Sequence, residues 1–240
     1  MSADDTRVLE QPSLRDLVVT SLRTRILARE LAVGQRLDVA ELARAYHISQ
    51  GPVREALIVL ESEGVVRSRA RRGVYVSEIS TLDLVEIYQA REAVEVMCIG
   101  LLLAPPAGSV RPDPMAAVAA LTGILSRIEA EWDAHDWAAA VAADMDFHCT
   151  LAAHAGNGRL ARIARTLADQ TLMHLGQVVA AEQDLLLRPT AEYHQRIVRA
   201  ISEGARTGQS AAAQHAVQSH YDWSRRRLTD PTLGLAADKA

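Results

Sequence analysis

The feature that most constrains the fold is the stretch "YHISQGPVREALIVLESEG", from Tyr46 to Gly64. A helix ends at its start, and a short polar turn leads to a second helix that begins around Pro52, because proline is tolerated in the first turn of a helix. Ser49 can cap this second helix, and Gly64 permits a left-handed exit at its end. The pattern predicts two helices joined by a tight turn.

The flanking residues extend this pattern to a larger motif. Apolar residues recur with a helical period from Leu14 to Ala28, and a short helix is predicted from Val39 to Tyr46. The segment "VVRSRARRGVYVSEI" places β-branched residues on both sides of a basic turn that contains glycine, which predicts a β-hairpin. Two helices joined by a tight turn and followed by a hairpin make a winged helix-turn-helix.

Strand signals disappear after Ser80, and the remaining sequence predicts a helical bundle with short connections. The fold class is therefore mainly α, with an N-terminal winged helix-turn-helix, a small β-hairpin wing and a C-terminal antiparallel α-helical bundle. The predicted divisions are a tail at 1–12, a winged helix-turn-helix domain at 13–79, a helical domain at 80–229, and a tail at 230–240. The predicted bundle helices run approximately from Leu82 to Leu103, Met115 to Ala134, Trp137 to Ala155, Arg159 to Ala181, Leu187 to Ser202 and Ser210 to Arg227.

Composition excludes several classes of protein. Apolar residues make up 49% of the chain, which is enough for a hydrophobic core. The longest apolar run, Val96 to Ala104, is too short to cross a membrane, and the polar, acidic N-terminus lacks the features of a secretory signal. We therefore predict a cytoplasmic protein with no membrane partner. The net charge of −4 conceals a basic patch, Arg67 to Gly73, with four arginines in seven positions.

The winged motif suggests which residues touch DNA. The second helix of a helix-turn-helix enters the major groove with its N-terminal residues at the base edges. Arg54 lies about 100° from the buried Val53 around the helix, so it can reach a base or a phosphate. Alternatively, Arg54 pairs with a surface carboxylate and the basic hairpin is merely solvated, but the two features together favour DNA binding. The predicted contact residues are Ser49, Gln50, Gly51, Arg54, Arg69, Arg71, Arg72 and Gly73.

Four residues of the helical part carry possible metal chemistry. Asp144 and His148 are four residues apart and share one face of a helix, while His194 and His220 each lie on the apolar face of their own helix. Three imidazoles and one carboxylate from three helices suit a divalent transition metal, and nitrogen-rich ligation favours zinc, nickel or iron over calcium or magnesium. Taken singly, each histidine is more often a hydrogen-bonded core residue than a metal ligand.

Arg91 falls in the middle of an apolar helical stripe, although arginine is almost never buried without a partner. One interpretation is an internal ion pair with Glu95, one turn later. The other is that Arg91 faces a cavity and binds the carboxylate of a small organic acid, whose other oxygens meet the metal. Both interpretations remain open.

The motifs resemble a known family. The segment 31–76, with "PVREAL" followed by a Glu-Gly pair and an Arg-Gly wing, is similar to the DNA-binding domain of GntR-type bacterial transcription regulators. The motifs "REAVE", "DMDFH", "AGNGRL" and "EYHQRIVRAI" are similar to the helical, FCD-type ligand-binding domain of the FadR subfamily. The four metal positions match metal-binding members, and the resemblance implies zinc, with nickel, iron or manganese as alternatives, and a small carboxylate effector. In one departure, Gln50 and Gly51 precede Pro52 where the family usually has an arginine and a threonine, so a base contact is expected to change.

These observations together predict a homodimeric transcription regulator that represses from a double-stranded DNA operator with inverted half-sites and is released by its effector. The predicted regulator is not an enzyme. A metalloenzyme acting on a small organic acid is the alternative from another class, but the neighbouring Asp146 points away from the four candidate ligands. A metal-free ligand sensor of the same family is a third possibility.

Two histidines compete for the last ligand position. His215 and His220 are five residues apart, so they lie about 140° apart around a helix and cannot both face one metal ion. His220 lies with the small apolar residues Ala213 and Val217, whereas His215 lies on the polar side. The segment "AVQSHYDW" also resembles the ligand-bearing helix of the family. We therefore predict His220 as the ligand and His215 as a surface residue.

Overall fold

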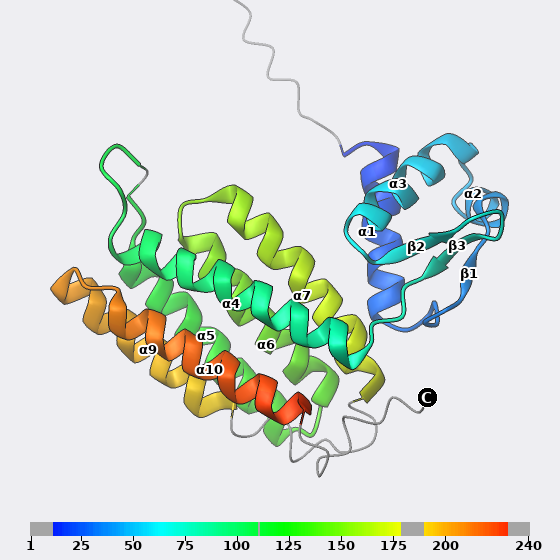
Figure 1. Cartoon of the computed structure of the whole chain (residues 1–240). Helices are drawn as coiled ribbons and strands as arrows, with labels where there is room; N and C mark the ends of the chain where they lie inside the picture. Colours follow the sequence, from blue (N-terminus) through cyan, green and yellow to red (C-terminus); the bar gives the residue numbers. More distant parts are fainter. Residues whose placement is uncertain (1–11, 110, 179–189, 230–240) are drawn as a thin grey trace, which may run out of the picture. The chain divides into compact units, whose positions relative to one another are not determined.

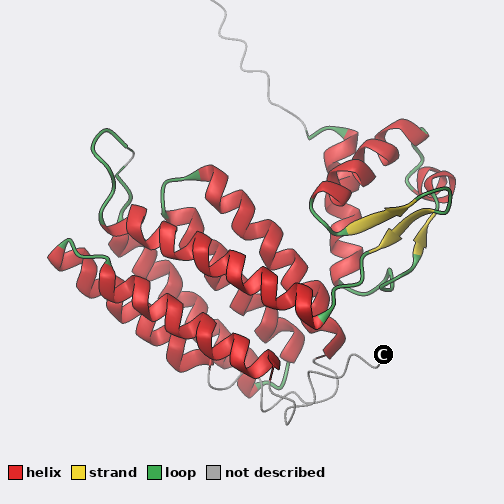
Figure 2. Ribbon diagram, viewed as in Figure 1, coloured by secondary structure: helices red, strands yellow, loops and turns green. Residues whose placement is uncertain are grey.

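The computed structural model describes residues 12–109, 111–178 and 190–229, and the chain divides into two compact units between Glu78 and Ile79 (Figure 1). Helices dominate both units, and the strands among the described residues belong to the first unit (Figure 2). The predicted fold class, a winged helix-turn-helix followed by a helical bundle, is confirmed. The predicted tails fall outside the described residues except for Pro12, and so does the break predicted at 182–189.

The first unit contains three helices, α1 (Leu14–Leu27), α2 (Val39–Ala45) and α3 (Gln50–Ser62). The side chains of Ser13 and Asp38 accept backbone N–H groups at the starts of α1 and α2, which satisfies donors that lack a partner within the helix. Helix α3 packs against both α1 and α2. Its apolar stripe is buried, as predicted, at Val53, Ala56, Leu57 and Leu60.

The beginning of α3 differs from the prediction. The helix starts at Gln50 rather than near Pro52, and Ser49 occupies the N-cap position without a side-chain capping hydrogen bond. Pro52 therefore lies inside the first helical turn, where the missing N–H removes no intrahelical bond. The left-handed exit at Gly64 is confirmed by its φ of +72°.

The wing is larger than predicted. Strands β2 (Val66–Arg69) and β3 (Gly73–Val76) form the expected antiparallel hairpin, and a short strand β1 (Arg36–Leu37) pairs with the other edge of β3. The sheet order is β1-β3-β2. Two residues are too few to show the alternation that identifies a strand, so β1 was missed.

The second unit is a bundle in which successive helices run back and forth, and none of its described helices is long and apolar enough to cross a bilayer (Figure 1). A capping box formed by Ser80 and Asp83 begins the first of these helices. Most helix ends lie within a few residues of the predicted ones. The helices are α4 (Thr81–Leu103), α5 (Pro114–Asp133), α6 (Trp137–His154), α7 (Gly158–Val178), α9 (Thr190–Thr207) and α10 (Ala211–Thr229).

Helix α4 is the central element of this bundle, because it packs against α6, α7, α9 and α10. The apolar core draws fully buried side chains from five helices, including Leu84, Leu121, Phe147, Ile197 and Tyr221. A helix surrounded on most sides has few solvent-facing positions, so any polar residue on its inner faces must find partners within the bundle. This placement makes α4 the helix that carries buried charge.

Helix α9 continues past the predicted break. A break was expected from Gly204 onward, but α9 extends to Thr207 and the chain turns at Gly208, which has a φ of +71°. A Cβ on Gly204 would lie 2.6 Å from a Leu103 methyl carbon and 2.6 Å from the Gln209 carbonyl oxygen. Gly204 therefore serves close packing inside a helix rather than ending it.

We expect Gly204→Ala to lower the free energy of unfolding by roughly 1–3 kcal/mol, because the added methyl group must displace its neighbours. Gly123→Ala in α5 is the matched control, since a Cβ added there would meet nothing within 4 Å. That control should raise the stability by about 0.5–1 kcal/mol. Urea titrations monitored by circular dichroism make the measurement, and equal effects of the two changes would contradict the close approach at Gly204.

Candidate nucleic-acid interface and metal centre

The exposed beginning of α3 carries four of the residues predicted to contact DNA. Ser49, Gln50, Gly51 and Arg54 are all exposed. The Arg54 Nη2 group donates to Gln50 Oε1 at 3.1 Å, which holds the guanidinium near the first turn of the helix. A Cβ on Gly51 would meet only Ser49 Oγ at 3.9 Å, so packing does not require glycine there. This end of α3 is a polar surface free to meet a partner.

The tip of the hairpin presents three exposed wing arginines, Arg69, Arg71 and Arg72. The Arg69 guanidinium carbon lies 4.8 Å from the centre of the Tyr75 ring, and the Tyr75 hydroxyl donates to the Arg72 carbonyl oxygen at 2.9 Å. Gly73, with a φ of +103°, allows the turn between the strands. Tyr75 therefore contacts both the side chain of Arg69 and the backbone of Arg72 at this basic tip.

Within the described ranges, carboxylates do not neutralise the charges on these arginines. Among the described residues, no carboxylate pairs with Arg54 or with any of the wing arginines, whereas Arg67 at the base of the hairpin pairs with Glu78 at 2.6 Å. The alternative interpretation required an ion pair between Arg54 and a surface carboxylate, and the described residues do not form one. Unpaired surface cations next to a helix-turn-helix suit phosphate binding.

In the second unit, three helices bring the predicted metal ligands together. Asp144 and His148 come from α6, His194 from α9 and His220 from α10. His194 Nε2 lies 3.3 Å from His148 Nε2 and 3.4 Å from Asp144 Oδ1. One ring nitrogen from each histidine lies within 4.8 Å of the others, and all three side chains are buried. The histidines and the aspartate form one enclosed cluster, called here the histidine cluster.

A carboxylate from α4 orients one of these histidines. Glu95 Oε2 lies 2.8 Å from His148 Nδ1, and the Tyr221 hydroxyl donates to Glu95 Oε1. Burial by itself raises the pKa of the Glu95 carboxyl, but His148 and Arg91 outweigh it and lower that pKa below its ordinary value. An ionised carboxylate only accepts hydrogen bonds, so His148 Nδ1 is the donor in this contact.

The atoms of the histidine cluster fit a metal ion. Asp144 Oδ1, which lies 3.4 Å from His194 Nε2, is buried without a hydrogen-bond partner, which is unfavourable unless another group satisfies it. Burial lowers the pKa of His194 to about 4 and lowers that of His220 well below its ordinary value. Both imidazoles are therefore neutral near pH 7, as metal ligation requires. Three imidazoles and one carboxylate match the donors of zinc and related ions.

Arg91 is buried beside this cluster with its bonding capacity partly unused. Its Nε lies 4.0 Å from Glu95 Oε1, and its Nη1 donates to Thr171 Oγ1 at 3.4 Å. The guanidinium also lies over the Tyr88 and Tyr221 rings, and its Nη2 has no hydrogen-bond partner. Burial disfavours its charge, but Tyr221 and Glu95 raise its pKa above the ordinary value. Arg91 therefore forms the predicted ion pair with Glu95, at the long distance of 4.0 Å, and its Nη2 group remains available as a donor.

Sequence reasoning overlooked three participants. Glu95 was considered only as a partner of Arg91, and its contact with a histidine 53 positions later was not anticipated. Tyr221 directly follows a predicted ligand, and Thr171 is a polar residue on the inner face of α7. A polar side chain at a buried helical position was the available signal for each of them, but its partner lies on another helix.

Two neighbouring residues lie outside the histidine cluster, as predicted. His215 is exposed on α10, whereas His220 is only 4% exposed. Asp146 points away from the cluster, and its Oδ2 accepts a hydrogen bond from Arg127 at 2.6 Å. Neither residue is placed to touch an ion held by the histidine cluster.

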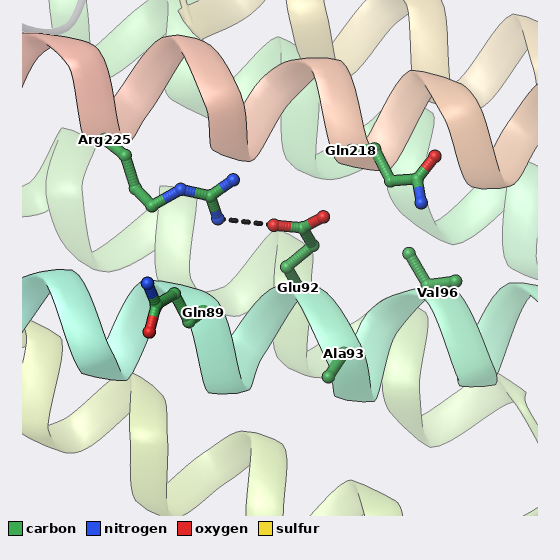
Figure 3. Close-up of a pocket in the computed structure, with 6 residues that line it drawn as sticks. All are labelled: Gln89, Glu92, Ala93, Val96, Gln218 and Arg225. Carbon is green, nitrogen blue, oxygen red and sulfur yellow. Dashed lines mark hydrogen bonds and ion pairs between the residues drawn. The ribbon is translucent and has the colours of Figure 1, made fainter.

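A separate hollow of about 330 Å³ lies at the surface between α4 and α10 (Figure 3). An ion pair between Glu92 and Arg225 bridges the two helices there. None of the predicted ligands lines this hollow, so we do not assign it to the metal or to the effector. Its lining residues are Gln89, Glu92, Ala93, Val96, Gln218 and Arg225.

A winged helix-turn-helix with exposed arginines, followed by a helical domain with a buried polar cluster, is typical of a DNA-binding transcription regulator. Comparison with known families agrees: residues 14–76 match the family described as "Bacterial regulatory proteins, gntR family", and residues 86–222 match the FCD domain. The chain belongs to the GntR family of bacterial transcription regulators and carries a FadR-type FCD domain.

Curated relatives support this assignment. The chain is 27% identical over 215 residues to the "Probable D-xylose utilization operon transcriptional repressor" of Paenarthrobacter nicotinovorans, covering 90% of this chain and 87% of that protein. It is 27% identical over 157 residues to the transcriptional repressor GlaR of Escherichia coli, covering 62% and 66% of the two chains. With the regulator YdhC of Bacillus subtilis, 30% identity extends over 29% of this chain and 31% of that protein. The match to several relatives thus spans about a third of their length.

Two solved structures share the fold. A GntR regulator from Rhodococcus sp. RHA1 superposes with a TM-score of 0.69 at 22% identity, covering 89% of this chain and 96% of that one. Escherichia coli McbR/YncC superposes with a TM-score of 0.70 at 20% identity, covering 89% and 95%. The matched family and the named repressors are transcription regulators, so the metalloenzyme alternative is set aside.

Proposed function

We propose that this chain is a homodimeric repressor whose activity depends on a metal and a small carboxylate. In this proposal the domain at 13–79 binds an operator with inverted half-sites, and the domain at 80–229 binds both ligands and forms the dimer. The carrying observation is the convergence of three buried histidines and one carboxylate in the helical domain of a DNA-binding chain. Repression is favoured because two relatives are named repressors. The proposed place of action is the cytoplasm.

On the DNA side, α3 enters the major groove and the wing arginines contact the flanking backbone or the minor groove. The exposed Arg54 supplies a base or phosphate contact, and Ser49 and Gly51 let the helix end approach the groove closely. Gln50 stands where the family usually carries an arginine. Because a glutamine amide pairs best with adenine and an arginine with guanine, the preferred base at that position is expected to differ from the family's.

On the ligand side, Asp144, His148, His194 and His220 would hold a divalent transition metal. Zinc is the first choice because it accepts imidazole and carboxylate ligands at four-coordinate sites, and nickel, iron and manganese are the alternatives. The bound metal would supply positive charge and open positions for oxygen atoms of an effector. Burial keeps two of the imidazoles unprotonated, which supports tight binding near neutral pH.

The proposed effector contact is Arg91, whose free Nη2 can donate to a carboxylate oxygen. A guanidinium already fixed by Thr171 and two tyrosine rings loses little entropy on binding, and its bonds to a carboxylate are charge-assisted. A small acid bound between Arg91 and the metal would link the two sites. The coupling between operator and effector is reciprocal, so an acid that weakens operator binding itself binds the DNA-bound protein less tightly.

A metal-free sensor of the same family is the second candidate. The observation that favours it is the continuous hydrogen bonding of His148, Glu95 and Tyr221, which a polar core also provides without an ion. Metal analysis of protein purified without chelators separates the two: a stoichiometric transition metal supports the first proposal, and its absence supports the second.

We expect Arg54→Ala to reduce operator affinity by roughly 1–3 kcal/mol, because a contact from the recognition helix is lost. Replacing Arg71 and Arg72 with Ala should weaken binding to all duplexes similarly and flatten the salt dependence, because phosphate contacts release counterions. Anisotropy titrations at several salt concentrations, with an operator selected from random duplexes and with unrelated DNA, make the measurement. Arg199→Ala, on the exposed face of α9, is the control. Unchanged operator binding by Arg54→Ala would count against this placement of α3.

We expect His220→Ala to lose bound metal and His215→Ala to keep it, because the first side chain is buried in the histidine cluster and the second is exposed. The measurement is metal per chain by elemental analysis after purification without chelators. Each variant also serves as the matched control of the other. The reverse outcome would show that His215, and not His220, supplies the ligand of α10.

We expect Arg91→Lys to keep the metal and operator affinity but to abolish the response to carboxylates, because lysine retains the charge without the planar fork. A thermal-shift screen with a panel of small mono- and dicarboxylates, with and without zinc, measures the response, since ligands that bind the native state raise apparent stability. A variant that unfolds or loses metal, while its carboxylate response stays normal, would assign Arg91 to a structural pair with Glu95.

A further inference from the structure

Glu95 is a buried carboxylate with three charged or polar partners, and the proposed metal and effector contacts give it no role. It is only 1% exposed, and its two oxygens have different partners. Oε2 lies 2.8 Å from His148 Nδ1, while Oε1 accepts from the Tyr221 hydroxyl and lies 4.0 Å from Arg91 Nε. These contacts bring together side chains from α4, α6 and α10.

This geometry has a definite consequence for His148. A carboxylate that accepts at Nδ1 requires that nitrogen to carry a proton, so in the neutral ring Nε2 is the nitrogen with the lone pair. Nε2 is the atom that lies 3.3 Å from His194 Nε2 and 3.9 Å from Asp144 Oδ2, so the free lone pair points into the histidine cluster. A negative charge on the far side of the ring also makes Nε2 a stronger electron donor.

The two other partners keep Glu95 in this position. The Tyr221 hydroxyl occupies Oε1, and Arg91 supplies a positive charge on the same side. With one oxygen held by Tyr221 and the other by His148, the two partners together fix the plane of the carboxylate. An unpaired buried carboxylate is strongly unfavourable, so this set of contacts holds together as a unit.

We propose that Glu95 is a positioning residue for the metal: it fixes the tautomer and orientation of His148 and thereby sets the metal affinity of the histidine cluster. This inference rests on the proposed function, because it presumes that the histidine cluster binds a metal. Glu95 itself does not touch the ion. It acts through the ring of His148, as outer carboxylates do at other histidine-metal sites.

The test compares metal affinity in full-length variants, with Co²⁺ as the probe in competition with a chromophoric chelator. Glu95→Gln keeps the size of the side chain but removes its charge, and its amide group can donate to the ring as well as accept from it. We expect a 10- to 100-fold weaker affinity, together with a changed cobalt absorption spectrum. Glu92→Gln, on the same helix but paired with Arg225 at the surface, is the matched control and should bind as the wild type does. Wild-type affinity in Glu95→Gln would overturn the proposal.

A second measurement avoids dependence on the folding of that variant. Nitrogen-15 spectra of histidine-labelled, metal-free wild-type protein report which ring nitrogen of His148 is protonated, and we expect Nδ1. Tyr221→Phe retains the carboxylate but frees Oε1, so it should weaken Co²⁺ binding by a smaller factor than Glu95→Gln. A proton found on Nε2 of His148 in the wild type would overturn the proposal even if Glu95→Gln does not fold.

The failure of this inference can be distinguished from failure of the proposed function. If the wild type binds Co²⁺ and His220→Ala does not, the metal site stands, and the Glu95 variants alone decide the role of Glu95. If the wild type does not bind Co²⁺, the proposed metal site is wrong and the positioning role falls with it.

Discussion

Burying charge inside an all-helical bundle is the constraint on which the rest of the helical domain depends. Arg91 and Glu95 are 3% and 1% exposed, and a lone ion in such a place is strongly unfavourable. The structure meets this constraint by surrounding each with groups from other helices: His148 from α6, Thr171 from α7 and Tyr221 from α10. Apolar contacts alone tolerate small shifts of one helix along another, whereas these polar contacts select one register.

The same constraint explains why the candidate ligand sites lie together. Burial in a low-dielectric interior disfavours the charged form of histidine. It therefore lowers the pKa of His194 to about 4 and keeps this imidazole neutral near pH 7. Neutral imidazoles bind metals, and a buried guanidinium with a free donor binds carboxylates. Helix α4 carries the guanidinium and begins at Thr81, only a few residues after strand β3 ends at Val76. The covalent path from the wing to the helix that carries Arg91 is therefore short.

Local patterns were sufficient for much of the secondary structure and for the main candidate residues. Helical periodicity located the helices of both units, and the i, i+4 spacing of Asp144 and His148 correctly placed them on one buried face. The wheel argument that separated His220 from His215 also agrees with their exposure. Strand β1 was missed because two residues carry no period. The end of α9 was predicted wrongly because a glycine near the end of a helical pattern usually signals a break. Gly204 instead lies within the helix, where the missing Cβ lets Leu103 and the backbone of the following turn pack closely.

The sequence by itself determined the family of folds, the exposed arginines at the start of α3 and on the wing, and the faces on which the histidines lie. These properties depend on neighbours within one or two helical turns, so spacing along the chain is enough to reveal them. Only the tertiary structure decided that Glu95 contacts His148 as well as Arg91, and that the Tyr221 hydroxyl donates to the same carboxylate. The reason is physical: a buried polar side chain must find a partner, but the identity of that partner depends on which helices pack together, and periodicity does not specify this.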